Sequence, residues 1–303
     1  MVATAADTVS DVNASPTGQV VPWLPEGRTL VVPGRGELFY RYYRHPEPTA
    51  PVVFLLHGWT ASGDLQFFTA YEALAEHYSF LTIDYRGHGR GLRIDSRFEL
   101  EDVADDAAAL LDALDVQQVI AVGYSMGGPV AMLLARRHPQ LVRGLIVQAT
   151  ALEWCSSVFD RVRWKTARII GPLLRSFAYQ RWLIHGIRRL LGPGHALQRY
   201  VPWLAGEMRR NDPLTMVQAG QAISRYDARP WAAQLNVPAA SLVTSRDRLV
   251  KPRKQYALAK ALGAEVRELS GDHLSPWLHP IEFAELTVDL VELVDAKIAT
   301  PLT

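Results

Sequence analysis

Short apolar runs recur along most of the chain, and segments with helical periodicity separate them. Strands that alternate with helices of this length form crossover units, so the pattern predicts a mostly parallel sheet. The predicted strands are residues 29–32, 37–43, 52–56, 80–83, 118–122, 141–148, 239–244 and 265–269, and predicted helices follow at 65–77 and 100–114. The first two strands are expected to form an antiparallel hairpin around the turn at 33–36.

The alternation stops between residues 151 and 229, where strand signals disappear and Trp, Arg and Leu predominate. This segment holds 13 Lys and Arg against 5 Asp and Glu. Its spacing predicts basic amphipathic helices that are interrupted at Gly171-Pro172 and Gly192-Pro193. We therefore divide the chain into a tail at 1–25 that we expect to be disordered, a core at 26–150 and 230–298, and a helical insertion at 151–229.

The composition excludes several classes of function. At 303 residues and 49% hydrophobic content the chain can bury a large core, and its net charge of +1 gives no reason to expect nucleic-acid binding. The single cysteine, Cys155, excludes an internal disulfide, and we expect no metal or other cofactor. Signal-peptide character and long apolar runs are missing, so we expect a cytoplasmic protein, soluble or peripheral to a membrane. The oligomeric state stays open.

The most informative motif is Gly123-Tyr124-Ser125-Met126-Gly127, which stands between an apolar run and a helix-forming stretch at 130–135. This G-x-S-x-G pattern is typical of a nucleophile elbow, where two glycines permit a strained turn that exposes a serine hydroxyl. A larger residue at Gly123 or Gly127 is expected to break that turn. The motif alone does not exclude the alternative, an ordinary Gly/Ser turn of an α/β protein.

A second strand end, at His57-Gly58, suggests how a developing oxyanion is bound. Acyl transfer needs two backbone N–H donors, one directly after the nucleophile and one after an earlier strand. The amides of Met126 and Trp59 are the candidates. We interpret His57 itself as a buried residue that shapes the loop rather than as a base or a metal ligand.

A third strand runs into the turn at 84–89, which carries Asp84 and Arg86. A carboxylate and a guanidinium beside a tight turn usually pair with the backbone and with each other. We therefore expect both residues to be structural.

A serine hydroxyl becomes a good nucleophile only when a histidine accepts its proton and a carboxylate orients that histidine. Asp247 and His273 follow consecutive predicted strands, whose carboxyl ends are where α/β sheets concentrate their chemistry. Two other carboxylates are weaker candidates. Asp272 adjoins His273, and neighbouring loop residues point apart; Asp227 precedes Arg229-Pro230 on an expected surface loop.

With these residues the chain resembles the α/β-hydrolase superfamily, in its serine-nucleophile, esterase or lipase-like branch. The resemblance extends from about residue 34 to 294 and is carried by His57-Gly58, the turn at 84–89, the segment 123–128, Asp247 and His273. It implies Ser125 as the nucleophile, His273 as the general base and then acid, and Asp247 as the orienting carboxylate. It also implies the Trp59 and Met126 amides as the oxyanion hole. Trp59, Tyr124 and Leu274 are the expected substrate contacts.

The resemblance further implies an α/β-hydrolase fold, with a mostly parallel central sheet flanked by helices and residues 151–229 as a helical cap or lid. A serine at the elbow argues against the haloalkane dehalogenases and epoxide hydrolases, whose nucleophile is aspartate. Relatives often carry an acidic residue before a proline where this chain has Leu278-His279-Pro280. That departure makes His279 an alternative base.

The implied activity is hydrolysis of carboxylic esters through an acyl-enzyme, and the apolar lid favours a lipid-like small molecule with a medium or longer acyl chain. The lid arginines are interpreted as a solvated face; the alternative is peripheral contact with an anionic membrane. The same residues also serve thioesterases, C–C bond hydrolases, perhydrolases, peptidases and acyltransferases. A non-catalytic ligand-binding protein is a further alternative, against which the complete set of Ser, Asp and His argues.

Overall fold

The computed structural model describes residues 20–93, 95–155 and 177–300. Its strands are β1 (Gly27–Val32), β2 (Gly36–Tyr43), β3 (Val52–Leu56), β4 (Ser79–Ile83), β5 (Val119–Tyr124), β6 (Val142–Gln148), β7 (Ala239–Thr244) and β8 (Glu265–Leu269). They form one sheet in the order β1-β2-β4-β3-β5-β6-β7-β8. β2 pairs antiparallel with β1 and β4, and the other neighbours are parallel. Each predicted strand is present, and the predicted hairpin and parallel pairing are confirmed.

Alternating side chains of the central strands fill two hydrophobic layers, one on each face of the sheet. In β3, Phe54 and Leu56 pack into one layer, while Val53 and Leu55 pack into the other. Because successive side chains of a strand point to opposite faces, a strand covered on both sides is apolar throughout. This double burial explains the uninterrupted apolar runs of the sequence.

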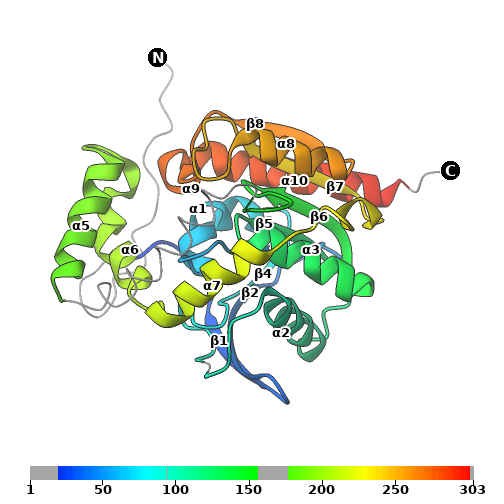
Figure 1. The fold of residues 1–303 in the computed structure, drawn as a ribbon, viewed down its shortest axis with the longest axis horizontal. Coiled ribbons are helices and arrows are strands. Elements are labelled where there is room, and N and C mark those ends of the chain that lie inside the picture. The colour runs from blue at the N-terminus through cyan, green and yellow to red at the C-terminus, as the bar shows by residue number, and fades with distance from the viewer. Residues whose placement is uncertain (1–19, 94, 156–176, 301–303) are drawn as a thin grey trace.

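Helices cover both faces of the sheet (Figure 1). α1 (Gly63–Ala75) and α10 (Pro280–Ala299) pack together on one face, and the short α9 (Ser275–Leu278) precedes α10. α2 (Leu100–Ala113), α3 (Gly127–Arg137) and α8 (Pro252–Ala261) belong to the layer on the other face. α1 begins two residues before its predicted start because the Ser62 hydroxyl accepts a hydrogen bond from the Leu65 amide (3.2 Å) and caps the helix.

The stretch that precedes β1 packs against the core. The Trp23 ring lies edge-on to Tyr43, with 5.8 Å between ring centroids, and the Pro25 carbonyl accepts a hydrogen bond from Arg41. The expected disordered tail at 1–25 therefore does not include residues 20–25. Residues 1–19 of that prediction lie outside the described residues.

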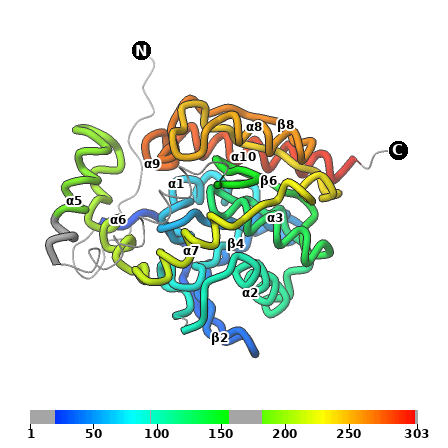
Figure 2. Tube along the Cα trace, viewed as in Figure 1, coloured from blue at the N-terminus to red at the C-terminus, as the bar shows by residue number. Residues whose placement is uncertain are grey.

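The described part of the predicted insertion contains the α-helices α5 (Phe177–Leu191), α6 (Val201–Met208) and α7 (Pro213–Arg225). α5 and α6 lie at one end of the molecule, near α1 (Figure 2), and α7 packs against α2. α5 ends directly before Gly192, which has a φ of 75°, as the Gly192-Pro193 break predicts. The predicted break at Gly171-Pro172 lies outside the described residues. None of the helices in the described ranges combines the length and apolar character that a bilayer crossing requires.

Candidate active site

Ser125 lies at the turn between β5 and α3. Its φ is 54°, in the left-handed region that non-glycine residues rarely adopt. The Ser125 N–H donates to the Gln148 carbonyl (2.9 Å), and the Ser125 carbonyl accepts from the Gly128 N–H (3.0 Å). These two backbone bonds hold the residue in its strained conformation, as surrounding structure must where such strain persists.

The glycines on either side of this turn leave no room for a side chain. A Cβ at Gly127 would collide with the carbonyl of Leu56 in β3, and a Cβ at Gly123 would collide with the carbonyl of Gly127. Both collisions are with backbone, which cannot rotate away. The structure therefore supports the expectation that a larger residue at either position breaks the turn.

Asp247 and His273 approach Ser125 from the ends of β7 and β8. His273 Nε2 lies 2.9 Å from Ser125 Oγ, and His273 Nδ1 lies 2.7 Å from Asp247 Oδ2. A proton on Nδ1 is donated to the carboxylate, which leaves the Nε2 lone pair directed at the serine hydroxyl. The arrangement can thus take the proton from Ser125 as the oxygen reacts.

Further hydrogen bonds fix the carboxylate. Asp247 Oδ1 accepts from the N–H groups of Leu249 (2.8 Å) and Val250 (2.9 Å), and Asp247 Oδ2 accepts from Thr244 Oγ1 (3.0 Å). The Asp247 side chain is fully buried. With the carboxylate held from both sides, the plane of the His273 ring is set by the core rather than by solvent.

Tyr124, an expected substrate contact, lines the cavity beside Ser125 and also supports the loop that carries His273. Its hydroxyl donates to the His273 backbone carbonyl (2.9 Å), and the residue is 1% exposed. Its ring packs between His273 and Phe283. The tyrosine of the G-x-S-x-G motif therefore joins the elbow to the loop that carries the histidine.

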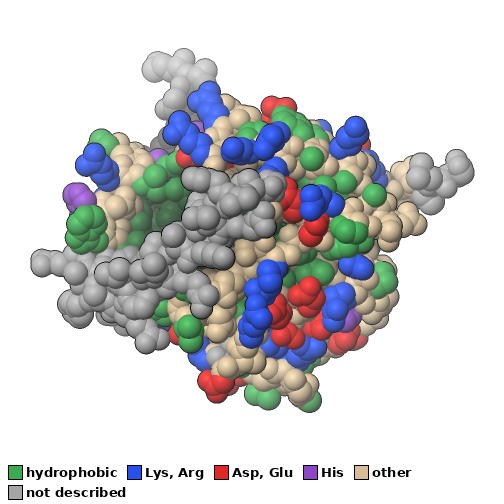
Figure 3. Space-filling model, in the orientation of Figure 1, with side chains coloured by type: hydrophobic (Ala, Val, Ile, Leu, Met, Phe, Trp, Pro, Cys, Tyr) green, Lys and Arg blue, Asp and Glu red, His purple; other side chains and the backbone are tan. Residues whose placement is uncertain are grey.

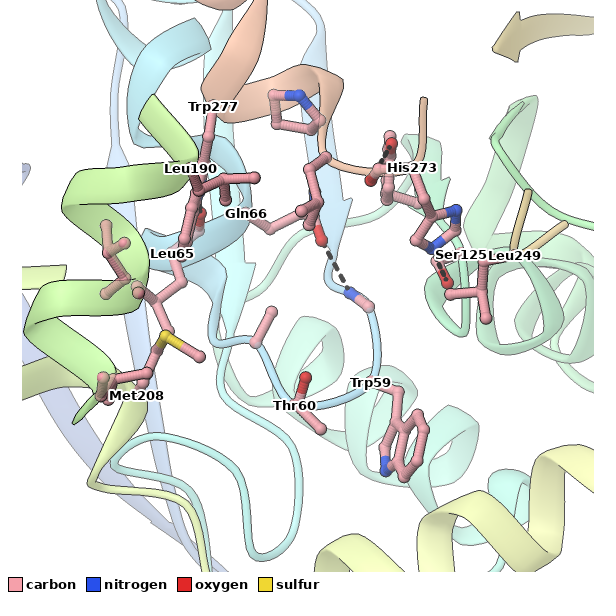
Figure 4. A pocket seen from close by; sticks show the side chains of 18 of the residues that line it. Trp59, Thr60, Leu65, Gln66, Ser125, Leu190, Met208, Leu249, His273 and Trp277 are labelled. Carbon is pink, nitrogen blue, oxygen red and sulfur yellow. Dashed lines mark hydrogen bonds between the residues drawn. The ribbon is translucent and has the colours of Figure 1, made fainter. Parts of the chain in front are cut away.

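The loop after β3, where an oxyanion donor is expected, is held by side chains from two helices. Gly58 N–H donates to Gln66 Oε1 of α1 (3.3 Å), and the Trp59 indole N–H donates to the Met216 carbonyl of α7 (2.8 Å). Figure 4 shows the Trp59 indole turned away from the serine. The other expected donor, the Met126 amide, stands at the N-terminus of α3, where the first N–H groups have no acceptor within the helix.

His57 is buried and structural, as predicted. Its Nε2 accepts from the Tyr85 N–H (3.1 Å), its Nδ1 donates to the Gly58 carbonyl (2.8 Å), and its ring stacks on Tyr85. Burial, together with the neighbouring His88, lowers the pKa of His57 well below its ordinary value. Burial also lowers the pKa of His88 to about 4. Both rings are therefore uncharged at neutral pH.

Asp84 and Arg86 are also structural, but the prediction that they pair with each other is wrong. Asp84 accepts from the N–H groups of Gly63 (2.9 Å) and Arg90 (2.8 Å), whereas Arg86 pairs with Asp106 of α2 (2.8 Å). Burial raises the pKa of Asp84 to about 7. Proximity in sequence suggested the wrong partner, because the acidic face of α2 packs against this loop.

The weaker candidates have other contacts. Asp272 Oδ1 accepts from the Leu274 N–H (2.8 Å), and Asp227 pairs with Arg229 at 2.6 Å. His279 directly precedes α10, and its ring lies beside Gly271. No group of three or more His, Cys, Asp or Glu side chains in the described part of the chain is arranged to hold a metal ion.

A cavity of about 740 Å³ extends from Ser125, and its lining is mostly apolar. The serine and His273 lie on one side, and Leu65, Met208 and Trp277 lie on the other (Figure 4). Figure 3 shows hydrophobic side chains gathered in a hollow beside α5. The insertion contributes Trp182, Leu183, Ile187, Leu190, Met208 and Ile223 to the lining. Leu274, an expected substrate contact, also lines the cavity and is 41% exposed.

Sequence reasoning missed several lining residues of the core, among them Gln66, Leu249 and Trp277. The Trp277 indole donates to the Leu65 carbonyl (2.8 Å) and so fastens α9 to α1. Leu249 and Trp277 follow Asp247 and His273 by two and four residues. The position of Leu249 and Trp277 just after the expected acid and base could therefore have indicated that they line the cavity. Nothing near Gln66 in the sequence indicated that it does so.

The fold agrees with comparison to known proteins. Residues 51–164 match the family model described as the alpha/beta hydrolase fold. The structure is similar to the enol-lactonase from Burkholderia xenovorans LB400, with a TM-score of 0.74 and 23% identity, over 88% of this chain and 100% of that chain. The chain therefore has the α/β-hydrolase fold.

Two curated relatives extend the likeness over most of the chain. One is the pimeloyl-[acyl-carrier protein] methyl ester esterase of Neisseria meningitidis serogroup C, 29% identical over 79% of this chain and 93% of that protein. The other is a putative carbamate hydrolase of Serratia proteamaculans, 25% identical over 78% of this chain and 89% of that protein. The names of both relatives describe hydrolysis at a carbonyl group.

Proposed function

We propose that the protein is a serine hydrolase that cleaves carboxylic esters through an acyl-enzyme. The observation that carries this proposal is the hydrogen-bonded series Ser125, His273 and Asp247 at a mostly apolar cavity. The esterase relative supports an ester as the substrate class. The serine mechanism and the size of the acyl group go beyond that support and are tested below.

Acylation begins when Ser125 Oγ bonds to the ester carbonyl carbon while His273 Nε2 takes the hydroxyl proton. The carbonyl oxygen becomes an oxyanion, which the amides of Trp59 and Met126 would bind. The tetrahedral intermediate then collapses, and the bond to the alcohol oxygen breaks as that oxygen receives the proton from Nε2. The alcohol leaves, and the acyl group remains on Ser125.

Deacylation repeats these steps with water in the place of serine. Water gives a proton to His273 Nε2 as its oxygen bonds to the acyl carbon, and the proton passes to Ser125 Oγ when that oxygen leaves. Asp247 keeps its charge throughout and stabilises the imidazolium that forms twice per turnover. The products are a carboxylic acid and the free enzyme.

The cavity lining supports an apolar acyl group of medium or longer chain. Leu190 and Trp182 of α5 form part of that lining, so the insertion would act as a lid that covers the acyl chain. Burying each additional methylene contributes about 0.8 kcal/mol. Longer chains should therefore bind more tightly until the cavity is filled.

A series of p-nitrophenyl esters from acetate to dodecanoate tests the proposal. We expect kcat/KM to rise from C2 to a maximum at C6 or beyond, and we expect Ser125→Ala to abolish turnover of every ester. A maximum at C2 with a steady decline would contradict the acyl-chain proposal. Turnover undiminished in Ser125→Ala would contradict the serine mechanism.

We also propose that the basic face of α5 gives peripheral contact with an anionic membrane. Arg188 and Arg189 are exposed on this helix, and Trp182, 80% exposed, lies on it as well. Each Lys or Arg near an anionic surface contributes about 1 kcal/mol. The protein should cosediment with phosphatidylcholine vesicles that contain phosphatidylglycerol. The Arg188→Glu, Arg189→Glu double variant should stay in the supernatant. Equal binding to pure phosphatidylcholine vesicles would contradict the contact.

A further inference from the structure

The loop that would supply the oxyanion donor lies between the core and the insertion, and its backbone is strained. Thr60, directly after Trp59, has a φ of 63°. A β-branched residue in the left-handed region costs free energy, and such a conformation persists only where neighbouring groups hold it. The contacts that hold this loop should therefore also fix the orientation of the neighbouring Trp59 amide.

One of these contacts comes from Asn211, in the connection between α6 and α7. Asn211 Nδ2 donates to the Thr60 carbonyl (2.7 Å), and Asn211 Oδ1 accepts from the Gly89 N–H (2.8 Å). One side of the carboxamide faces a donor and the other faces an acceptor, so a carboxamide satisfies both and a carboxylate does not. The side chain ties the oxyanion loop to the loop after β4.

The connection that carries Asn211 is itself fastened to the core. The Asp212 N–H donates to the Gly87 carbonyl (2.7 Å), and Arg93 donates to the Arg210 carbonyl (2.7 Å). Glu207, at the end of α6, is paired with Arg90 through two bonds of 2.7 Å, and its side chain is 4% exposed. Asn211 thus acts from a fixed position.

The insertion holds the same loop at a second point, through the 2.8 Å bond from the Trp59 indole to the Met216 carbonyl of α7. On the opposite side, the core holds it through the bond from Gly58 N–H to Gln66 Oε1. Two of these three contacts come from the insertion. The insertion therefore does more than line the cavity with apolar side chains.

From these contacts we infer that Asn211 is a positioning residue for the oxyanion hole, through which the insertion sets the orientation of the Trp59 amide. The inference rests on the proposed function, because it needs an oxyanion to form at Ser125. Oxyanion donors act only when aimed at the oxygen of the tetrahedral intermediate, and small misplacements reduce the rate strongly. Loosening the Asn211 contact should lower kcat and leave ground-state binding in the apolar cavity nearly unchanged.

The test compares Asn211→Asp and Asn211→Ala with the wild type and with Gln218→Ala. Asn211→Asp keeps an acceptor for the Gly89 N–H but turns a carboxylate oxygen toward the Thr60 carbonyl. Gln218, on α7, accepts a hydrogen bond from the Phe98 N–H (3.0 Å). Gln218→Ala therefore removes a comparable bond between the insertion and the core, at a different place. We expect kcat to fall about tenfold or more in both Asn211 variants, with KM within twofold of the wild type, and no such change in Gln218→Ala.

A trifluoromethyl ketone with an alkyl tail supplies a readout that a purely structural role would not move. Ser125 adds to this ketone, and the resulting hemiketal oxyanion occupies the hole. Its inhibition constant should rise in the Asn211 variants by about the same factor as kcat/KM falls, at temperatures well below their unfolding midpoints. A folded Asn211→Asp or Asn211→Ala with kcat and ketone inhibition like those of Gln218→Ala would overturn the inference. Failure of the proposed function would look different, because Ser125→Ala would then retain turnover.

Discussion

Two glycines beside Ser125 and two glycines of the insertion sit in opposite surroundings. At Gly123 and Gly127 an added Cβ would collide with the backbone of a neighbouring element, whereas at Gly186 of α5 and Gly206 of α6 it would meet no described atom within 4 Å outside its own helix. The core is tightly packed around Ser125, while there is open space beside these glycines of α5 and α6. The difference suggests that the core fixes the reacting atoms and that the insertion adapts the cavity to a substrate.

Asp247 of the core and Asp227 of the insertion show a similar contrast. Asp247 of the core is fully buried and hydrogen-bonded to His273, while Asp227 at the end of the insertion pairs with Arg229 on an exposed surface. A buried, fixed carboxylate can hold a histidine tautomer, whereas an exposed ion pair contributes little. The Asn211 contact is the proposed exception, because it would let the insertion act on the chemistry.

The largest expected effect is on turnover. Asp247→Asn should lower kcat by about 10⁴-fold, because an amide favours the wrong tautomer of the His273 ring. Asp227→Asn is the matched control and should stay within twofold of the wild type. Steady-state kinetics on one ester checks both, and comparable losses in the two variants would remove the distinction between core and insertion.

The next effect is on stability. Gly127→Ala should reduce the free energy of unfolding by about 3 kcal/mol or more, because the methyl group meets the Leu56 carbonyl. Gly186→Ala should instead raise it by about 0.5–1 kcal/mol, since alanine is the better helix former and has room. Chemical denaturation measures both values. A tolerated Gly127→Ala would show that the elbow is looser than its contacts indicate.

Acid should destabilise the fold through His88. Its pKa is about 4 in the fold, against an ordinary value of 6.5, so the unfolded chain binds more protons between these values and stability falls as pH drops. The contribution is about 3 kcal/mol between pH 7 and pH 4. Asp84, whose pKa is raised to about 7, acts with the opposite sign over the same range.

A variant isolates the His88 contribution from that of Asp84. Between pH 7 and pH 4, the free energy of unfolding of His88→Phe should rise by about 3 kcal/mol relative to that of the wild type, whatever the contribution of Asp84. His185→Gln, on the exposed side of α5, is the control from the insertion and should keep the wild-type slope. Parallel pH profiles for all three proteins would contradict the assignment to His88.

The smallest effect concerns chain length. Leu190 of α5 lines the cavity and is 40% exposed, so Leu190→Ala should lower kcat/KM for octanoate about threefold relative to butyrate. The ratio of the two esters, measured on one preparation, cancels errors in enzyme concentration. An unchanged ratio would mean that α5 does not contact the acyl chain.

The success of prediction from sequence also differs between local patterns and long-range contacts. The strands were predictable because burial on both faces made them apolar throughout, and Asp247 and His273 were candidates because both follow strands of a parallel sheet. The partner of Arg86 and the role of Asn211 were not predictable. Arg86 pairs with Asp106, 20 residues away on α2, and Asn211 bonds to Thr60, which is 151 residues away in the sequence. Local patterns carry no information about such contacts.

Labelling with a fluorophosphonate, followed by peptide mass spectrometry, tests the central claim most directly. The probe reacts only with a serine whose proton a neighbouring base removes, so the account predicts one stoichiometric adduct on Ser125 in the wild type. It also predicts no adduct in Ser125→Ala and a strongly slowed reaction in Asp247→Asn. An adduct on another residue, or equal labelling of Ser125→Ala, would contradict it.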